Sequence, residues 1–158
     1  MSGLINSVGS KSGIIGSTEI PGGYETGTYT PALAVDGGSN ITAGYDGDTK
    51  GIYTIIGNLV TVTGFINLSS ESVSSGAMMV TLPKTSTSAV THNSAIVGMS
   101  TGWSATEAPV GGYVPASSAR IYLTRMGGSD ARSNLESAVG GNSVGSNSQI
   151  AFSVTYRI

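Results

Sequence analysis

Residues 52–68 decide the fold class, and they read IYTIIGNLVTVTGFINL. Two runs rich in β-branched and aromatic residues flank Gly57-Asn58. Both of these turn residues tolerate positive φ, so the stretch predicts a tight β-hairpin. In the second arm, Leu59–Leu68, alternate residues are apolar or glycine. A period of two indicates that one face of this strand is buried.

Further β-rich runs on both sides of the hairpin predict a chain built from strands. They are Thr28–Val35, Ile41–Tyr45, Ala77–Leu82, Ser94–Trp103, Val110–Val114, Arg120–Thr124 and the alternating residues 150–158. Between them we expect a polar loop at Ser69–Ser75 and one helical turn at Arg132–Val139. Gly98 and Gly102 indicate a bulge or a close backbone approach. About eight strands separated by frequent turns predict an all-β fold, an antiparallel β-sandwich of jelly-roll-like type.

The composition supports this fold class and excludes several functions. The 158 residues include 24 Gly, 25 Ser and 17 Thr, a bias that disfavours helix. The formal net charge is −2 with no cluster of Lys and Arg, so we expect no nucleic-acid partner. No apolar run approaches ~18 residues, so no membrane insertion is expected. Only 10% of the residues are charged, too few to cover a monomer surface, which predicts an oligomer.

The sequence predicts no catalytic residue, no metal site and no cofactor. His92 is the single histidine, and its neighbours form no nucleophile motif. There is no Cys, and a zinc site needs more ligands than one His supplies. Asp46-Gly47-Asp48 is interpreted as a turn rather than half of a calcium loop. A pair of carboxylates that cleaves a glycan stays open as an alternative.

Residues 1–27 differ from the rest of the chain and are interpreted as an extended N-terminal arm that orders when it docks on a partner. The segment is rich in Gly and Ser, and Pro21-Gly22-Gly23 separates it from the first expected strand. Residues 28–158 form the expected sandwich domain. The arm carries scattered aliphatic side chains at Leu4, Ile5, Val8, Ile14 and Ile15.

Two aromatic residues, Trp103 and Tyr113, are candidates for glycan binding. Aromatic side chains near loop tips offer a large contact area at a small entropic cost. The alternative is that both pack in the core or at a subunit interface.

Several segments together resemble tail-fibre-like proteins and virion surface appendages of tailed phages, many of them marine. The matching segments are residues 51–66, residues 25–31 with their Gly-Thr-aromatic-Thr-Pro pattern, residues 80–83 ending in Leu-Pro, residues 147–156, and the leader at residues 2–13. They occur in the expected order and cover most of the chain.

The resemblance implies a homotrimeric β-sandwich at the surface of a virion. The aliphatic residues of the arm are then expected to anchor the domain to other virion proteins, such as a capsid, tail or adaptor protein, and host surface glycans are expected ligands. Many such fibres carry a long shaft, whereas about 27 residues precede the domain here. We therefore expect a short fibre-like or decoration protein without enzymatic activity. A glycan-degrading depolymerase and a monomeric carbohydrate-binding module are the alternatives.

Overall fold

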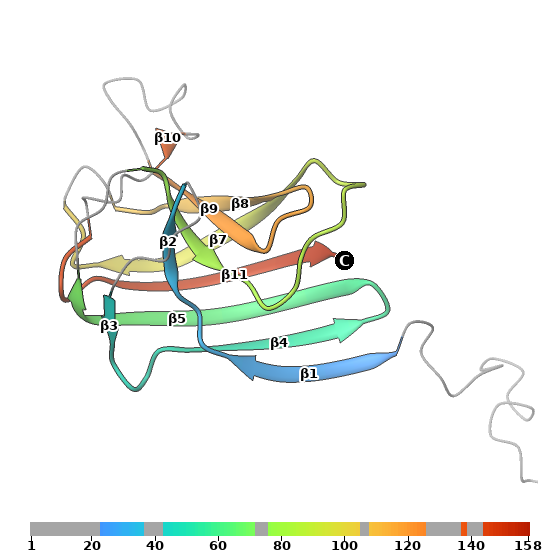
Figure 1. Cartoon of the computed structure of the whole chain (residues 1–158), viewed down its shortest axis with the longest axis horizontal. Helices are drawn as coiled ribbons and strands as arrows, with labels where there is room; N and C mark the ends of the chain where they lie inside the picture. Colours follow the sequence, from blue (N-terminus) through green and yellow to red (C-terminus); the bar gives the residue numbers. More distant parts are fainter. Residues whose placement is uncertain (1–22, 37–42, 72–75, 105–107, 126–136, 139–143) are drawn as a thin grey trace, which may run out of the picture.

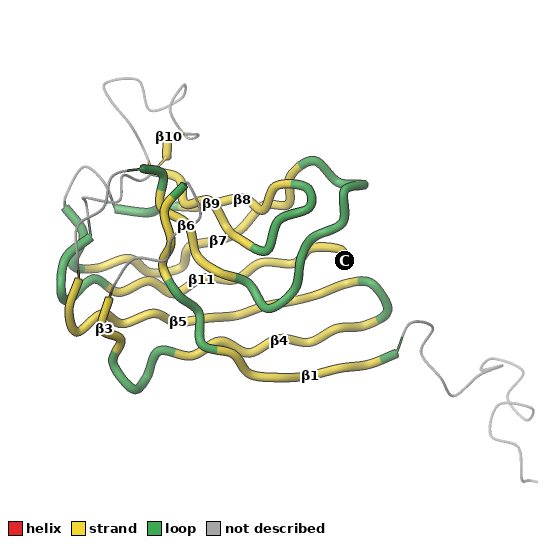
Figure 2. The backbone as a smooth tube through the Cα atoms, in the orientation of Figure 1, coloured by secondary structure: helices red, strands yellow, loops and turns green. Residues whose placement is uncertain are grey.

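The computed structural model describes residues 23–36, 43–71, 76–104, 108–125, 137–138 and 144–158, and these residues contain strands and turns but no helix (Figure 2). The strands are β1 Tyr24–Tyr29, β2 Leu33–Val35, β3 Ala43–Tyr45, β4 Lys50–Ile56, β5 Leu59–Glu71, β6 Met78–Thr81, β7 His92–Thr101, β8 Gly111–Pro115, β9 Arg120–Arg125, β10 Ser137–Ala138 and β11 Gln149–Arg157. The described part of the chain accordingly has no helix of the length and apolarity that a membrane span requires.

The strands form one antiparallel sheet in the order β1-β4-β5-β11-β7-β8-β9-β6-β2, with β3 beside β5 and β10 beside β9. The two end strands of this path, β1 and β2, are consecutive in the chain and are joined by residues 30–32. A short link between opposite ends requires the sheet to curl back on itself. Figure 1 shows the resulting half-barrel, with β1, β4 and β5 along one side and the link from β1 to β2 crossing in front of β4 and β5.

The predicted hairpin is present as β4 and β5, and it supplies much of the core. Gly57 has a φ of 63° in the two-residue turn, and Ile56 pairs with Leu59 directly beside it. The inward-facing residues of β5 and β11 are buried; they are Val60, Val62, Ile66, Leu68, Ile150, Phe152, Val154 and Tyr156. The period of two in the sequence therefore reports the inner face of the curled sheet.

Aromatic rings lie over glycines of neighbouring strands on this inner face. A Cβ at Gly64 would collide with the ring of Phe152, its partner on β11. The ring of Tyr53 occupies the corresponding space at Gly27 of β1. The glycines thus give large side chains room to lie flat inside a strongly curved sheet.

The all-β, antiparallel class is confirmed, whereas a jelly-roll-like sandwich is not, because the strands follow one continuous path. The expected strand Thr28–Val35 is wrong: it divides into the end of β1 and the whole of β2, which lie at opposite ends of that path. Pro31 lies at the division, since proline cannot donate to a ladder. Around it, the backbone N–H of Ala32 donates to Thr81 Oγ1 at 2.9 Å.

Other boundaries also change. Strand β1 begins at Tyr24, so residues 24–27 of the expected arm belong to the sheet. There they pair with the backbone N–H and C=O groups on the outer side of β4. Residues 69–71, expected in a polar loop, extend β5, and Ser70 and Glu71 pair with β3. Ser137–Ala138, expected in a helical turn, form β10 beside β9. The predicted irregularity at Gly98 is confirmed, because Ala151 pairs with Met99 whereas the next residue pairs with Val97.

Candidate binding surfaces

Trp103 has a structural role in the described fold. Its indole Nε1–H donates to the carbonyl oxygen of Gln149 at 3.0 Å, and its half-buried ring packs against the core. The preceding residue, Gly102, has a φ of 74°, and a Cβ there would collide with the backbone of Asn147. Trp103 thus attaches the end of β7 to the start of β11. For Trp103 the structure therefore matches the alternative given above, in which the ring packs against the core.

Tyr113 lies in the middle of strand β8 rather than at a loop tip. On the outer face of the sheet its ring lies between those of His92 and Tyr122, which come from the two neighbouring strands. The ring centroids of Tyr113 and Tyr122 are 5.5 Å apart at an interplanar angle of 15°, which is a stacked pair. Those of His92 and Tyr113 are 4.9 Å apart at 64°, an edge contact. We call these three residues the aromatic row.

The structure does not bring Trp103 and Tyr113 together. Tyr113 pairs with Ser94 near the start of β7, whereas Trp103 follows Thr101 at its end. At a rise of about 3.3 Å per residue, the two ends are roughly 23 Å apart. A single sugar ring cannot contact both, so the aromatic row, rather than the predicted pair, is the candidate binding surface.

Charged groups border the aromatic row at Tyr122. Burial raises the pKa of the Tyr122 hydroxyl, the Asp36 carboxylate raises it further, and Arg120 acts in the opposite direction. Asp36 and Arg120 both take part in further interactions. The row therefore combines ring surfaces with a hydroxyl, an imidazole and nearby charges, a combination suited to a polar ligand that also presents C–H groups. The sequence did not signal Tyr122 or His92, because their proximity depends on strand order.

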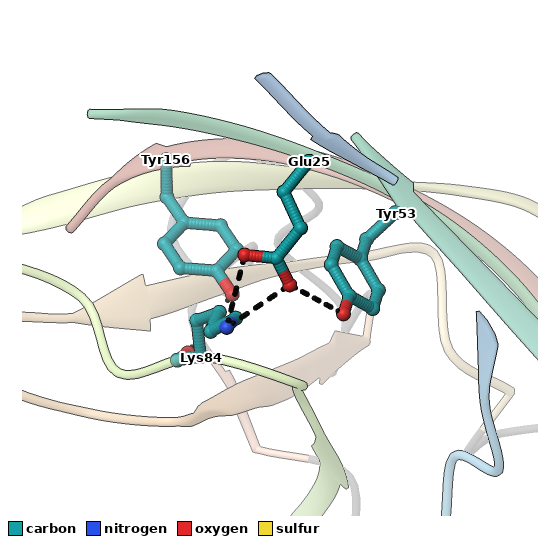
Figure 3. A network of polar contacts seen from close by, with 4 residues as sticks. All are labelled: Glu25, Tyr53, Lys84 and Tyr156. Atoms are coloured by element: carbon teal, nitrogen blue, oxygen red, sulfur yellow. Dashed lines mark hydrogen bonds and ion pairs between the residues drawn. The ribbon is translucent and has the colours of Figure 1, made fainter. Parts of the chain in front are cut away.

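A second polar cluster joins the two sides of the curl (Figure 3). Tyr53 donates from its hydroxyl to Glu25 Oε1 at 2.7 Å, and Lys84 Nζ lies 3.2 Å from the same oxygen. The Tyr156 hydroxyl donates to the Lys84 carbonyl at 2.9 Å. Strands β1, β4 and β11 are thereby connected to the loop that follows β6. We call these four residues the polar clasp.

The electrostatics of the polar clasp are those of a structural contact. The hydrogen bond from Tyr53 and then the contacts with Lys84 lower the pKa of Glu25 below its ordinary value. The bond to Glu25 in turn raises the pKa of Tyr53. Burial raises the pKa of Tyr156 to about 12. A carboxylate held ionised by two donors is a poor proton acceptor, so this arrangement favours cohesion over acid–base chemistry.

Two other described acids, Asp46 and Asp48, lie in a single turn. The backbone N–H of Thr49 donates to the Asp46 carbonyl at 2.9 Å, and the Asn67 amide donates to Asp48 Oδ1 at 3.2 Å. This geometry matches the turn predicted at Asp46-Gly47-Asp48. Within the described residues, no three His, Asp or Glu side chains gather as a metal site would require. The predicted anchoring residues Leu4, Ile5, Val8, Ile14 and Ile15 lie outside the described residues.

One feature of the surface was missed from the sequence: an exposed apolar group on the outer face of β1, β4 and β5. Tyr24, Ile56 and Leu59 pair directly across these three strands, and they are 63%, 50% and 41% exposed. Ile52, on the same face of β4, is 54% exposed. The alternation that predicts the inner face of β5 also places Leu59 outside, but it does not show which strands lie beside it.

Comparison with known proteins yields one likeness of fold. No protein-family model matches the chain, and no curated protein matches it. The crystal structure of the Dettilon tailspike protein contains a similar fold, with a TM-score of 0.66 and 21% sequence identity over 85% of this chain. The likeness covers 24% of the tailspike chain, so the present chain spans about a quarter of its length. At this identity the likeness establishes the shared all-β fold.

Proposed function

We propose that the chain is a structural protein of a tailed-phage virion, a short fibre-like or decoration appendage associated with the tail. The observation that carries this proposal is the fold shared with part of a tailspike over 85% of the chain. It agrees with the order of sequence segments that resemble fibre-like phage proteins. The low content of charged residues, 10%, also suits a protein that shares its surface with neighbours.

In this proposal the segment that precedes β1 anchors the domain to other virion proteins through Leu4, Ile5, Val8, Ile14 and Ile15. The described domain is the projecting part and assembles as a homotrimer. Its role is binding rather than catalysis.

Host surface glycans are the proposed ligands, and the aromatic row is their proposed site. Tyr113 lies between two rings, so we expect a sugar to meet the polar edges of the row, its hydroxyl and imidazole groups, rather than a ring face of Tyr113. We expect Tyr122→Ala to abolish retention on host envelope glycans. Trp103→Phe keeps an aromatic ring at a residue roughly 23 Å away and serves as the matched control. Equal retention of both variants and the unchanged protein would place the glycan site elsewhere.

The virion role is tested by locating the protein on purified particles. Gold-labelled antibody against the described domain should mark the particles at the tail. A chain without residues 2–20 should keep the strand-type circular dichroism spectrum but be absent from particles when it is produced beside the full chain. Particles that lack the full chain would contradict the virion role. Particles that take up both chains equally would contradict the anchoring role alone.

A further inference from the structure

Strand β1 presents an open hydrogen-bonding edge. It ends the strand path and pairs only with β4 among the described residues, and Figure 1 shows it at the margin of the sheet. The Gly57 N–H donates to the Gly23 carbonyl at 3.0 Å. In an antiparallel ladder the inward-bonded residues alternate, so residues 25, 27 and 29 bond to β4. The backbone N–H and C=O groups of Tyr24, Thr26 and Thr28 therefore point away from the sheet.

This edge lacks the features that keep edge strands from pairing. Natural edges are usually blocked by Lys, Pro or a bulge, or by a charge that points inward. Strand β1 contains neither Lys nor Pro, and its six pairs with β4 run without a register shift. Its one charged residue, Glu25, is bound by Lys84 and Tyr53 within the polar clasp. Within the described part of the chain, the edge is regular and open to a further strand.

An apolar surface lies directly beside the open edge. It consists of the exposed side chains of Tyr24, Ile52, Ile56 and Leu59 on the outer face, which we call the apolar shelf. Threonines separate its rows, with Thr26, Thr54 and Thr61 in register across the same three strands. A strand added at β1 extends the sheet and places its own outer side chains next to this shelf.

The absence of an unpaired charge on β1 favours a second copy of the chain as the partner. When identical strands pair antiparallel, identical residues come close to each other, and like charges placed opposite are destabilising. The only charge on β1 is neutralised within its own protomer by Lys84, and its side chain lies on the inner face. We infer that β1 pairs antiparallel with β1 of a second copy across a two-fold axis.

Such pairing satisfies both open edges at once and joins two apolar shelves into one continuous band. An axis at Thr26 places Tyr24 opposite Thr28, and an axis at Gly27 places Thr26 opposite Thr28. Both arrangements keep the two Glu25 carboxylates from facing each other directly. A two-fold contact cannot close a trimer, so it doubles the assembly that forms without it. This inference does not depend on the virion role.

The first test changes the open edge and measures mass by sedimentation. Thr26→Lys places a charge at the exposed centre of the edge, and we expect the mass of the assembly to fall by a factor of two. Thr101→Lys adds the same charge on the outer face of β7, at an exposed residue far from β1, and should leave the mass unchanged. An unchanged mass for Thr26→Lys, or a fall from three copies to one, would overturn the inference.

The second test uses cross-linking, because the chain contains no Cys. Directly opposed, hydrogen-bonded residues of antiparallel strands have Cα atoms about 5.5 Å apart, within the range of about 4.4–6.8 Å for a disulfide. A mixture of Thr26→Cys and Thr28→Cys proteins should therefore form a disulfide-linked dimer under mild oxidation. Thr101→Cys is the matched control and should stay a single chain. Equal cross-linking of all three variants, or none in the β1 pair, would refute the two-fold contact.

Discussion

The two halves of the curled sheet are held together in different ways. In the regular half, β1, β4, β5 and β11 pair in registers without interruption. The irregular half runs from β7 to β2 and begins with the register shift at Gly98. There, buried serines connect the loops: Ser86 Oγ donates to the Pro115 carbonyl at 2.6 Å, and Ser148 Oγ donates to the Gly102 carbonyl at 2.8 Å.

This difference explains how a chain so rich in Ser and Gly forms a defined core. Ladder hydrogen bonds satisfy the backbone within the strands, whereas side-chain hydroxyls satisfy it in the loops that connect the irregular half. Ser86 and Ser148 are only 3% and 1% exposed, so they belong to the interior. The regular half should therefore depend on apolar packing, and the irregular half on backbone geometry.

The largest effect is expected from Phe152→Ala in the regular half. The ring is 2% exposed and lies over Gly64 in the middle of the inner face. Its removal leaves a cavity beside a glycine that cannot fill it, and should lower the free energy of unfolding by about 3–5 kcal/mol. Urea denaturation followed by tryptophan fluorescence measures this loss. A loss below about 1 kcal/mol would mean that apolar packing does not dominate this half.

In the irregular half, two nearby glycines should respond differently to alanine. Gly102 has a φ of 74°, and a Cβ would meet the Asn147 carbonyl, so Gly102→Ala should cost about 2–4 kcal/mol. Gly98, the bulged residue, has open space around its Cβ position, so Gly98→Ala should change stability by less than about 0.5 kcal/mol. Thermal denaturation of the two variants compares them directly. Equal losses would contradict the role of backbone geometry at residue 102.

Two tyrosines of the regular half provide a smaller and opposite pair of effects. The Tyr156 hydroxyl donates to the Lys84 carbonyl, so Tyr156→Phe should cost about 1 kcal/mol. Among the described residues the Tyr29 hydroxyl is buried without a hydrogen-bond partner, and burial raises its pKa. Tyr29→Phe removes an unsatisfied group and should raise stability by up to about 1 kcal/mol. Urea midpoints of the two variants should move in opposite directions, and a shift of both in the same direction would contradict this account.

The smallest effect is expected in the polar clasp, and it should depend on pH. The pKa of Glu25 in the folded protein is lower than its ordinary value of 4.5. Its ionised form therefore stabilises the fold above that pH, and this contribution is lost as the pH falls through the folded-state pKa. Glu25→Gln should lower the urea midpoint slightly at neutral pH and leave it unchanged at acidic pH. Lys84→Gln should show the same dependence, and a difference that grows on acidification would contradict the assigned sign.

Particular residues show how far sequence reasoning reached. The hairpin around Gly57 and the alternation of residues 150–158 were predicted because one buried face imposes a period of two on each strand. The division of Thr28–Val35 was missed, because both halves are β-rich and only their partners differ. The same limit applies to the candidate site: Trp103 was identified by residue type, but its hydrogen bond to Gln149 crosses between segments distant in the chain.

The sequence by itself determined that the chain is all-β, where most strands lie and which face of the long strands is buried. These properties follow from local preference and from the alternation of side chains along a strand. Only the tertiary structure decided that Tyr24, Ile56 and Leu59 form one apolar shelf, that His92, Tyr113 and Tyr122 form one row, and that β1 is an edge. Each of these depends on which strands become neighbours. Strand order is fixed by the closure of the whole sheet around its core, and no local stretch of residues carries that information.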